Sequence, residues 1–212
     1  MSGCILGCQY IPSVEYFAHW MYHGSILIES HEHYPKRTWR NKTAIQGQSG
    51  PLFLSVPLRK GKHNQLPIKE VEISYDETWN RIHYQSIISA YGKTAFFSEM
   101  QSEFKDILYR DYQNLWDLNL TFIQYIIELI PGSWRFEFTG QYEQIQPEGI
   151  IDLRQGVPAG FSRIDVNKVL QYDQVHRLDK SHLPNLSILD VLCHLGPGTR
   201  DYLISYSDQL YK

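Results

Sequence analysis

The segment HEHYPKRTWRNK, at residues 31–42, gathers two histidines, an acid, four cations and an asparagine within a short distance. Three interpretations are open: a metal site, an anion-binding cradle, or a solvated bend between two strands. The guanidinium and ammonium groups suit phosphate or carboxylate, because Arg offers two parallel donors and Lys a point charge. A solvated face that keeps an edge strand from pairing explains the same cations. The cations alone therefore do not decide between the last two interpretations.

A metal site would require the strand that precedes this segment to continue to His33. Glu29, His31 and His33 would then share one face, and two imidazoles with a carboxylate can hold zinc or iron. A polar strand terminus explains the same residues, and no further ligand follows at a characteristic spacing. His19 and His23, four residues apart in a predicted helix, form a less complete set. The sequence assigns no metal site and indicates no cofactor.

His83 lies in the apolar stripe of a predicted helix, between Trp79 and Ile87. Burial lowers the pKa of an imidazole, which suits a general base near neutral pH. A hydrogen-bonded core histidine is the alternative, and it is the commoner outcome at such positions. The sequence contains no G-x-S-x-G elbow, P-loop or G-x-G-x-x-G fingerprint that would point to another chemistry.

The elements that must position these residues alternate between strand and helix, which predicts an α/β fold with a mixed sheet. Residues 4–10 and 25–30 are predicted strands on either side of a helix that begins at Pro12 and Ser13. Residues 41–46 and 52–58 flank the turn-rich GQSG and predict a hairpin, with Leu52, Leu54, Val56 and Leu58 alternating. Residues 68–74 are predicted as a further strand.

Helical periodicity begins after residue 76. It predicts helices through Trp79, His83, Ile87 and Tyr91, through Phe97, Met100, Phe104 and Ile107, and from Leu115 to Ile130. Later extended pieces, WRFEFTG and GIIDLR, are predicted to belong to a loop-rich region over the core. Near the end, Ser187 is predicted as an N-cap completed by Asp190 in a capping box, and Gly196 as the C-terminal cap. We predict a single domain over residues 1–212, with a strand-rich opening (1–76), a helical part (77–130) and a loop-rich part with two C-terminal helices (131–212).

Composition excludes several classes of function. The 20 Lys and Arg residues against 23 Asp and Glu residues give a net charge of -3, which argues against a nucleic-acid partner. Three cysteines are too few for a secreted disulfide framework, so we predict a cytoplasmic protein. The most apolar stretch, residues 115–130, is interrupted by Asp117, Asn119, Gln124 and Glu128, and this argues against a membrane span.

Four groups of residues occur in a characteristic order along nearly the whole chain. They are Gln9-Tyr10-Ile11-Pro12 with Tyr16-Phe17; Tyr34-x-Lys36-x-Thr38-Trp39-x-Asn41; Trp79-x-x-x-His83 with Ala90-Tyr91-Gly92; and Tyr172-x-Gln174 with Leu183-Pro184-Asn185-Leu186-Ser187-Ile188-Leu189-Asp190 and Gly196. In these motifs the chain resembles the WbqC-like family of bacterial proteins. Asn41 is followed by Lys42 where the family usually has Arg, and His31 and His33 replace acidic residues. The second departure weakens the metal hypothesis, because a metal common to the family would not need this pair.

The resemblance implies a role in the biosynthesis of bacterial surface polysaccharide (O-antigen). Because ligand clefts of α/β sheets form at strand ends, we expect residues from three separate segments to converge there. The leading hypothesis is an enzyme that transfers an acyl, aminoacyl or glycosyl group to or from an activated sugar, such as a nucleotide sugar. Its predicted binding residues are Gln9, Tyr10, Lys36, Arg40 and Asn41, and its predicted general base is His83.

Two alternatives belong to other classes. The first is a non-catalytic binding or scaffold protein of the same pathway, in which His83 is packed in the core. The second is a metal-dependent hydrolase, which would use Glu29, His31 and His33.

Overall fold

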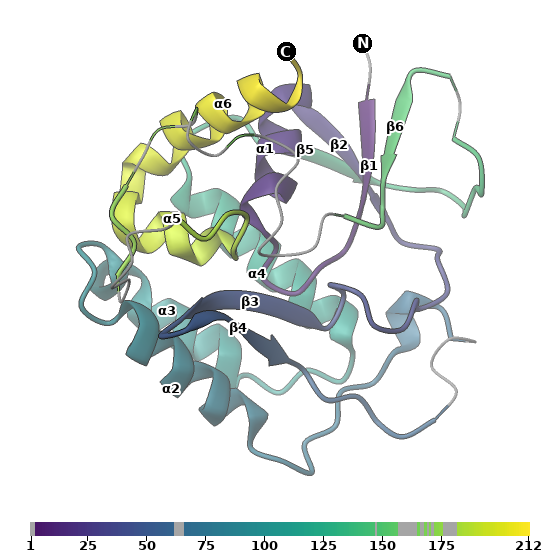
Figure 1. The fold of residues 1–212 in the computed structure, drawn as a ribbon. Helices are drawn as coiled ribbons and strands as arrows, with labels where there is room; N and C mark the ends of the chain where they lie inside the picture. Colours follow the sequence, from purple (N-terminus) through teal and green to yellow (C-terminus); the bar gives the residue numbers. More distant parts are fainter. Residues whose placement is uncertain are drawn as a thin grey trace.

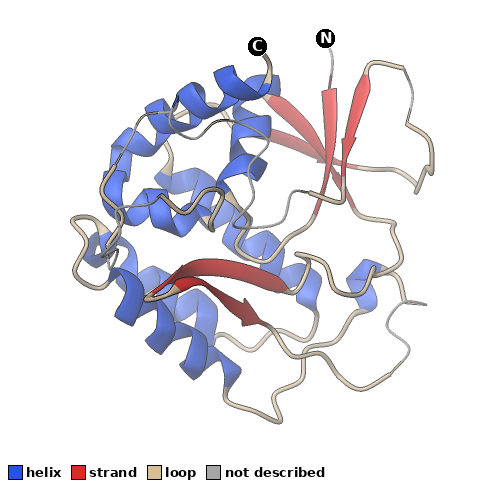
Figure 2. Ribbon diagram, in the orientation of Figure 1, coloured by secondary structure: helices blue, strands red, loops and turns tan. Residues whose placement is uncertain are grey.

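The computed structural model describes residues 3–61, 66–146, 148–156, 165, 168, 170, 172–175 and 182–212. The protein has the predicted α/β fold. Within the described residues, a four-stranded parallel sheet has the order β5-β2-β1-β6, and β3 and β4 form an antiparallel hairpin (Figure 1). Helices α1 and α6 lie together on one side of the parallel sheet, and the hairpin lies beside α2 (Figure 2).

The predicted opening unit is confirmed. It consists of β1 (Gly3–Gly7), α1 (Val14–His23) and β2 (Ser25–Glu29). The two strands pair in parallel, with Cys4 opposite Ile26, and these side chains pack into the core. Gly24 ends α1 in a left-handed conformation (φ 69°), where its N–H donates to the Trp20 carbonyl and a side chain would be strained. This connectivity brings the carboxyl end of β1 next to the amino end of α1.

The predicted hairpin is also confirmed, as β3 (Lys42–Gly47) and β4 (Gly50–Ser55). β4 ends earlier than the strand predicted over residues 52–58, because pairing with β3 ends at Ser55. Leu54 and Val56 are buried, whereas Leu52 is exposed and Leu58 forms only an isolated bridge to Ile73.

The three predicted helices are confirmed as α2 (Trp79–Tyr91), α3 (Phe97–Tyr109) and α4 (Leu115–Leu129). Within α4, the fully buried Asn119 donates through Nδ2 to the carbonyls of Cys8 (3.2 Å) and Arg40 (2.7 Å). This contact joins the end of β1 to the basic segment 31–42. Every helix among the described residues is too short or too polar to cross a bilayer.

Two expectations for the strands were wrong. The pieces expected in a loop-rich region are β5 (Arg135–Phe138) and β6 (Ile150–Leu153), which pair in parallel with β2 and β1. The strand predicted over residues 68–74 is instead the 3₁₀ turn η2 (Ile68–Glu70) followed by irregular backbone. Ile68, Val71 and Ile73 are all buried. The turn therefore buries the apolar side chains that suggested a strand, but without strand pairing.

The C-terminal part contains α5 (Ile188–Leu195), η4 (Gly196–Gly198) and α6 (Thr199–Leu210). Ser187 caps α5 by accepting from the Leu189 N–H at 3.3 Å, and Gly196 is the C-cap, as predicted. The capping box is wrong, because the buried Asp190 carboxylate accepts from Gln174 (2.7 Å) and Tyr172 instead.

The segment before α5 fixes the start of α1. Asn185 Oδ1 accepts from the Glu15 N–H, and the Leu186 carbonyl accepts from the Val14 N–H, both at 2.9 Å. Asn185 has a φ of 52°, a left-handed conformation that Asn tolerates better than most residues. This part of the sequence motif therefore caps the helix that carries the candidate site.

Candidate functional site

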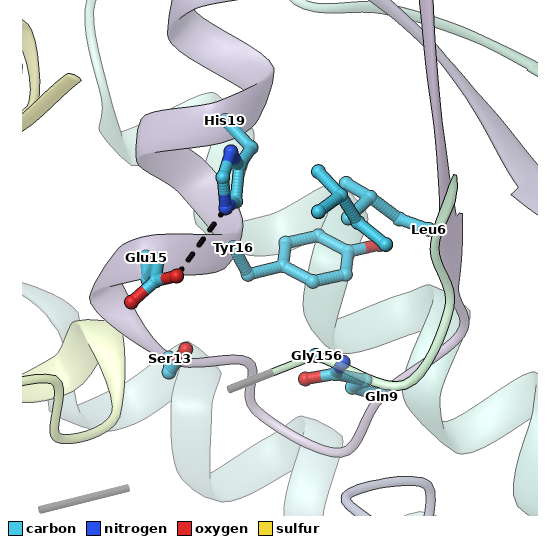
Figure 3. A pocket seen from close by; sticks show the side chains of 8 residues that line it. Leu6, Gln9, Ser13, Glu15, Tyr16, His19 and Gly156 are labelled. Carbon is cyan, nitrogen blue, oxygen red and sulfur yellow. Dashed lines mark ion pairs between the residues drawn. The ribbon is translucent and has the colours of Figure 1, made fainter. Parts of the chain in front are cut away.

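A narrow cavity of about 10 Å³ lies where the carboxyl ends of β1 and β6 approach the amino end of α1 (Figure 3). Its lining consists of Leu6, Gln9, Ser13, Glu15, Tyr16, His19, Leu153 and Gly156. The carboxyl edge of a parallel sheet is where α/β proteins place ligands, because the loops that follow the strands converge there. The polar groups of this cavity are therefore the first candidates for chemistry.

Glu15 and His19 face the cavity from successive turns of α1, four residues apart on one side of the helix. Glu15 Oε1 lies 3.4 Å from His19 Nε2, and the two residues are only 1% and 6% exposed. Glu15 lies in the first turn, where the helix dipole favours negative charge. The contact between the two side chains is not a hydrogen bond, so His19 Nε2 has no hydrogen-bond partner within the described residues and can accept a proton from a bound group, as a general base does.

Two hydroxyl groups add donors to the cavity. Tyr16 extends from α1 toward Leu6 of β1, and its buried Oη makes no hydrogen bond within the part of the chain that the structure describes (Figure 3). Burial raises the pKa of Tyr16 well above its ordinary value, so the phenol stays protonated. Ser13 is the N-cap residue of α1, but its side chain makes no capping hydrogen bond. Both hydroxyls can therefore contact a bound group.

Gly156 forms one wall of the cavity in a left-handed conformation (φ 65°). A Cβ at this position would lie 2.9 Å from Gln9 Nε2, so any side chain would displace the Gln9 amide. Gln9 and Ser13 also line a second cavity, of about 10 Å³, together with Trp39 and Lys42. Within segment 31–42, which is described throughout, Lys42 is the cation that reaches this lining.

The structure brings His83 and Tyr10 together, but in the core. The imidazole is 3% exposed, its Nδ1 lies 3.0 Å from Tyr10 Oη, and it also hydrogen-bonds to the Ser55 backbone. Burial lowers the pKa of His83 to about 4, although the Ser55 bond opposes that shift. The ring is therefore neutral at physiological pH. The catalytic role of His83 stays a prediction. Its imidazole already has hydrogen-bond partners in Tyr10 and the Ser55 backbone.

The buried His83 makes the stability of the fold depend on pH. The unfolded chain binds a proton at this ring near pH 6.5, whereas the folded chain does not until about pH 4. The stabilising effect is therefore fully present above pH 6.5 and is lost as the pH falls toward 4, by about 3 kcal/mol in total. Urea unfolding of the protein and of His83→Gln between about pH 7 and pH 4 measures it. A difference between the two proteins that stays constant with pH would contradict the assignment.

The basic residues predicted to bind substrate do not gather in one place. Arg40 is fully buried, and its Nε and Nη2 donate to the two Glu32 carboxylate oxygens at 2.9 and 2.8 Å. Asn41 accepts from Tyr34 Oη (2.8 Å) and donates to the Val56 carbonyl (2.9 Å), so its amide supports the backbone. Lys36 is exposed. The binding roles of Lys36, Arg40 and Asn41 remain predictions.

The weak metal candidates are also kept apart. β2 ends at Glu29, whose carboxylate accepts from Arg154 Nη1 (3.1 Å), Thr139 Oγ1 (2.8 Å) and the His31 N–H (2.8 Å). His31 and His33 are exposed, beyond the end of the strand. The strand extension that would have aligned them is wrong. Among the described residues, no group of three or more His, Cys, Asp or Glu side chains has an arrangement that could hold a metal ion.

Of the predicted site residues, Gln9 lines the first cavity, while Gln9 and Tyr10 both line the second cavity. Sequence reasoning assigned no site role to Ser13, Glu15 or Tyr16, and it considered His19 only as a metal ligand. The spacing of Glu15 and His19, i and i+4 at the start of a helix after a strand, was the signal that could have indicated the pair. Their burial was not readable from the sequence.

The fold and the cavity define an α/β protein with a candidate site at the carboxyl edge of a parallel sheet. Residues 8–160 match the model of the WbqC-like protein family, and the chain belongs to that family, as its motifs predicted. It is 27% identical over 224 residues to the uncharacterized protein Rv1507c of Mycobacterium tuberculosis, with 94% of this chain and 96% of the relative covered. The comparison with solved structures gave no significant match.

Proposed function

We propose that this protein is an enzyme of bacterial surface-polysaccharide (O-antigen) assembly that transfers an acyl, aminoacyl or glycosyl group to or from an activated sugar. The observation that carries the proposal is the buried Glu15–His19 pair, 3.4 Å apart, facing a cavity at the carboxyl edge of the sheet. In this site His19 Nε2 takes the proton of the attacking hydroxyl or amine, and the nearby Glu15 carboxylate stabilises the resulting positive charge.

The remaining polar groups supply binding and orientation. Gln9 offers both an amide donor and an acceptor between the two cavities, which suits the hydroxyls of a sugar acceptor. Lys42 lines the second cavity, where its ammonium would attract the phosphates of a nucleotide sugar or acyl donor. The sequence-based hypothesis gave this role to Lys36 and Arg40. Lys36 is retained as an exposed contact, whereas Arg40 would first have to leave Glu32.

A ligand screen tests the proposal. Nucleotide sugars and acyl donors are added to the purified protein, and the unfolding transition is measured. A true ligand at a hundred times its Kd should raise the stability by about 2.7 kcal/mol. Gln9→Leu should weaken the affinity about two- to tenfold by removing one hydrogen-bonding group. Gln85→Leu, a matched change at an exposed position of α2, should leave affinity unchanged.

The proposal fails in either of two cases. In the first, no compound of either class shifts the transition. In the second, a compound shifts it, but Gln9→Leu and Gln85→Leu have the same affinity as the unchanged protein, which would place binding outside the cavity.

One observation favours a second candidate, a non-catalytic binding or scaffold protein of the same pathway. His83, the histidine that its sequence motif singled out, is sealed in the core and hydrogen-bonded to Tyr10. In a scaffold protein, motif residues such as His83 would serve only to pack the core. On that hypothesis, cells carrying His19→Gln would make an unchanged polysaccharide profile, whereas the enzyme hypothesis predicts loss of the modified glycan.

A further inference from the structure

The Glu15–His19 pair continues outward through two more titratable side chains. His19 Nδ1, on the opposite side of the ring from Glu15, lies 2.6 Å from Tyr211 Oη. The same Oη lies 2.9 Å from His23 Nε2. His19 Nε2 makes no hydrogen bond within the described residues, so the hydrogen-bonded chain runs from His19 through Tyr211 to His23, with the Glu15 carboxylate 3.4 Å from its inner end.

This chain runs from the interior to the surface. Glu15 and His19 are buried beside the cavity, whereas Tyr211 and His23 are half-buried. His19 and His23 follow one another by four residues on α1, so they lie on the same side of the helix. The path therefore joins the enclosed ring of His19 to a ring that water can reach.

Tyr211 is held firmly between the two imidazoles. It is the C-cap residue of α6, and its N–H donates to the Ser207 carbonyl at 3.2 Å. Its ring stacks on Tyr22 with centroids 3.7 Å apart and planes at 7°. It meets His19 and His23 edge to face, at 82° and 88°. Nearby on α6, Asp208 and Lys212 pair with each other at 3.6 Å.

The chemistry of the hydroxyl gives the chain a direction. A phenol carries one proton, so Tyr211 donates to one imidazole and accepts an N–H from the other. Two arrangements satisfy both hydrogen bonds. In one, His19 Nδ1–H donates to Tyr211 and Tyr211 donates to His23 Nε2, and in the other, His23 Nε2–H donates to Tyr211 and Tyr211 donates to His19 Nδ1. A proton entering at one end and leaving at the other converts one arrangement into the other without moving a heavy atom.

We propose that Tyr211 and His23 form a proton relay between His19 at the cavity and the solvent. A proton taken up at His19 Nε2 releases the Nδ1 proton to Tyr211 Oη, and the hydroxyl proton passes to His23 Nε2. His23 then releases its Nδ1 proton to water, so that one proton enters, one leaves and no charge accumulates. The inference rests on the proposed function in that the relay resets the general base after each transfer.

A measurement without substrate tests the relay. The ¹⁵N chemical shifts of the His19 and His23 rings report which nitrogens carry protons as the pH is varied. In the unchanged protein, titration of His23 should also shift the His19 nitrogens. In Tyr211→Phe, which keeps the stacked ring, this coupling should vanish. Tyr22→Phe removes a hydroxyl outside the chain and should preserve it. If Tyr211→Phe retains the coupling, or the unchanged protein lacks it, the relay is overturned.

A kinetic measurement separates the relay from the proposed function. With a transfer substrate from the ligand screen, Tyr211→Phe should lower turnover at least about tenfold in dilute buffer. This decrease should be smaller than the decrease caused by replacing the general base His19. Added imidazole buffer should restore turnover, because it carries protons in place of the relay, whereas structural damage would not be repaired. Full activity of Tyr211→Phe in dilute buffer, or no rescue, overturns the relay. If the unchanged protein transfers no group, the proposed function fails and the ¹⁵N result alone decides the relay.

Discussion

Replacing Arg40 with methionine is expected to lower the free energy of unfolding by about 3 to 5 kcal/mol, the usual cost of removing one member of a buried ion pair. Arg40 is fully buried and makes two hydrogen bonds to Glu32. Burial raises the pKa of Glu32, and the Arg40 charge opposes that shift. Without the guanidinium, the Glu32 carboxylate must stay charged in the interior or bind a proton, and both cost stability. Urea unfolding at neutral pH measures the loss.

A double-mutant cycle isolates the pair from the packing of the arginine stem. Glu32→Leu alone should also be costly, because it leaves the Arg40 charge buried. The double variant Arg40→Met with Glu32→Leu should recover a large part of the loss, since two apolar side chains need no partner. A loss below about 1 kcal/mol for Arg40→Met would show that the pair is solvated like a surface bridge and free to bind an anion.

Gly7 shows how closely the guanidinium is packed against β1. A Cβ at this position would lie 2.6 Å from Arg40 Nη2 and 2.9 Å from Arg40 Cζ. The arginine of the basic segment therefore lies against the strand end, with no room for a phosphate between them. The geometry explains why a residue type that suits phosphate binding is used here to join segment 31–42 to the sheet.

The helices could be predicted from the sequence because their signal is local. Trp79, His83, Ile87 and Tyr91 recur every four residues, and all four are buried on one side of α2. The apolar residues of α3 and α4 follow the same rule. The opening strands and the hairpin could also be recognised, since each is short and bounded by turn residues. In all these cases the residues that decide the structure are neighbours in the chain.

The parallel sheet could not be completed from the sequence, because its pairing is not local. β5 and β6 pair with β2 and β1, which lie more than a hundred residues earlier. Four-residue strands such as RFEF carry no signal of their partner, and their exposed positions weaken the apolar pattern. Residues 68–74 illustrate the opposite error, in which three buried apolar side chains suggested a strand where η2 forms.

The candidate site was only partly predictable for a related reason. The number of cations in segment 31–42 suggested a binding site for an anion. A sequence does not distinguish a solvated arginine from one such as Arg40, which forms a buried ion pair with Glu32, eight residues earlier. The Glu15–His19 pair gives a weaker signal in the sequence, because it consists of two polar residues among apolar ones in a short helix. The pair lines a cavity only because β6 and Gly156, which lie far along the chain, complete the wall.

Replacing His19 with glutamine is expected to lower the turnover of group transfer by a factor of about 10² to 10⁴, the range found when a general base is removed. Glutamine can fill the space near Glu15 and Tyr211 and keep a hydrogen bond, but it cannot take a proton at neutral pH. Binding of the donor should change little, so the loss should appear in kcat rather than in KM. Steady-state kinetics with a substrate from the ligand screen measure it.

Two matched variants decide which histidine acts. His83→Gln tests the base that the sequence motif indicated, and it should retain most of its kcat if the protein remains folded, because the ring is sealed away from the cavity. His31→Gln, at an exposed position, controls for the substitution itself. If His83→Gln loses activity and His19→Gln does not, the base lies in the core behind Tyr10. The cavity would then have to be replaced as the site by a path that opens to His83.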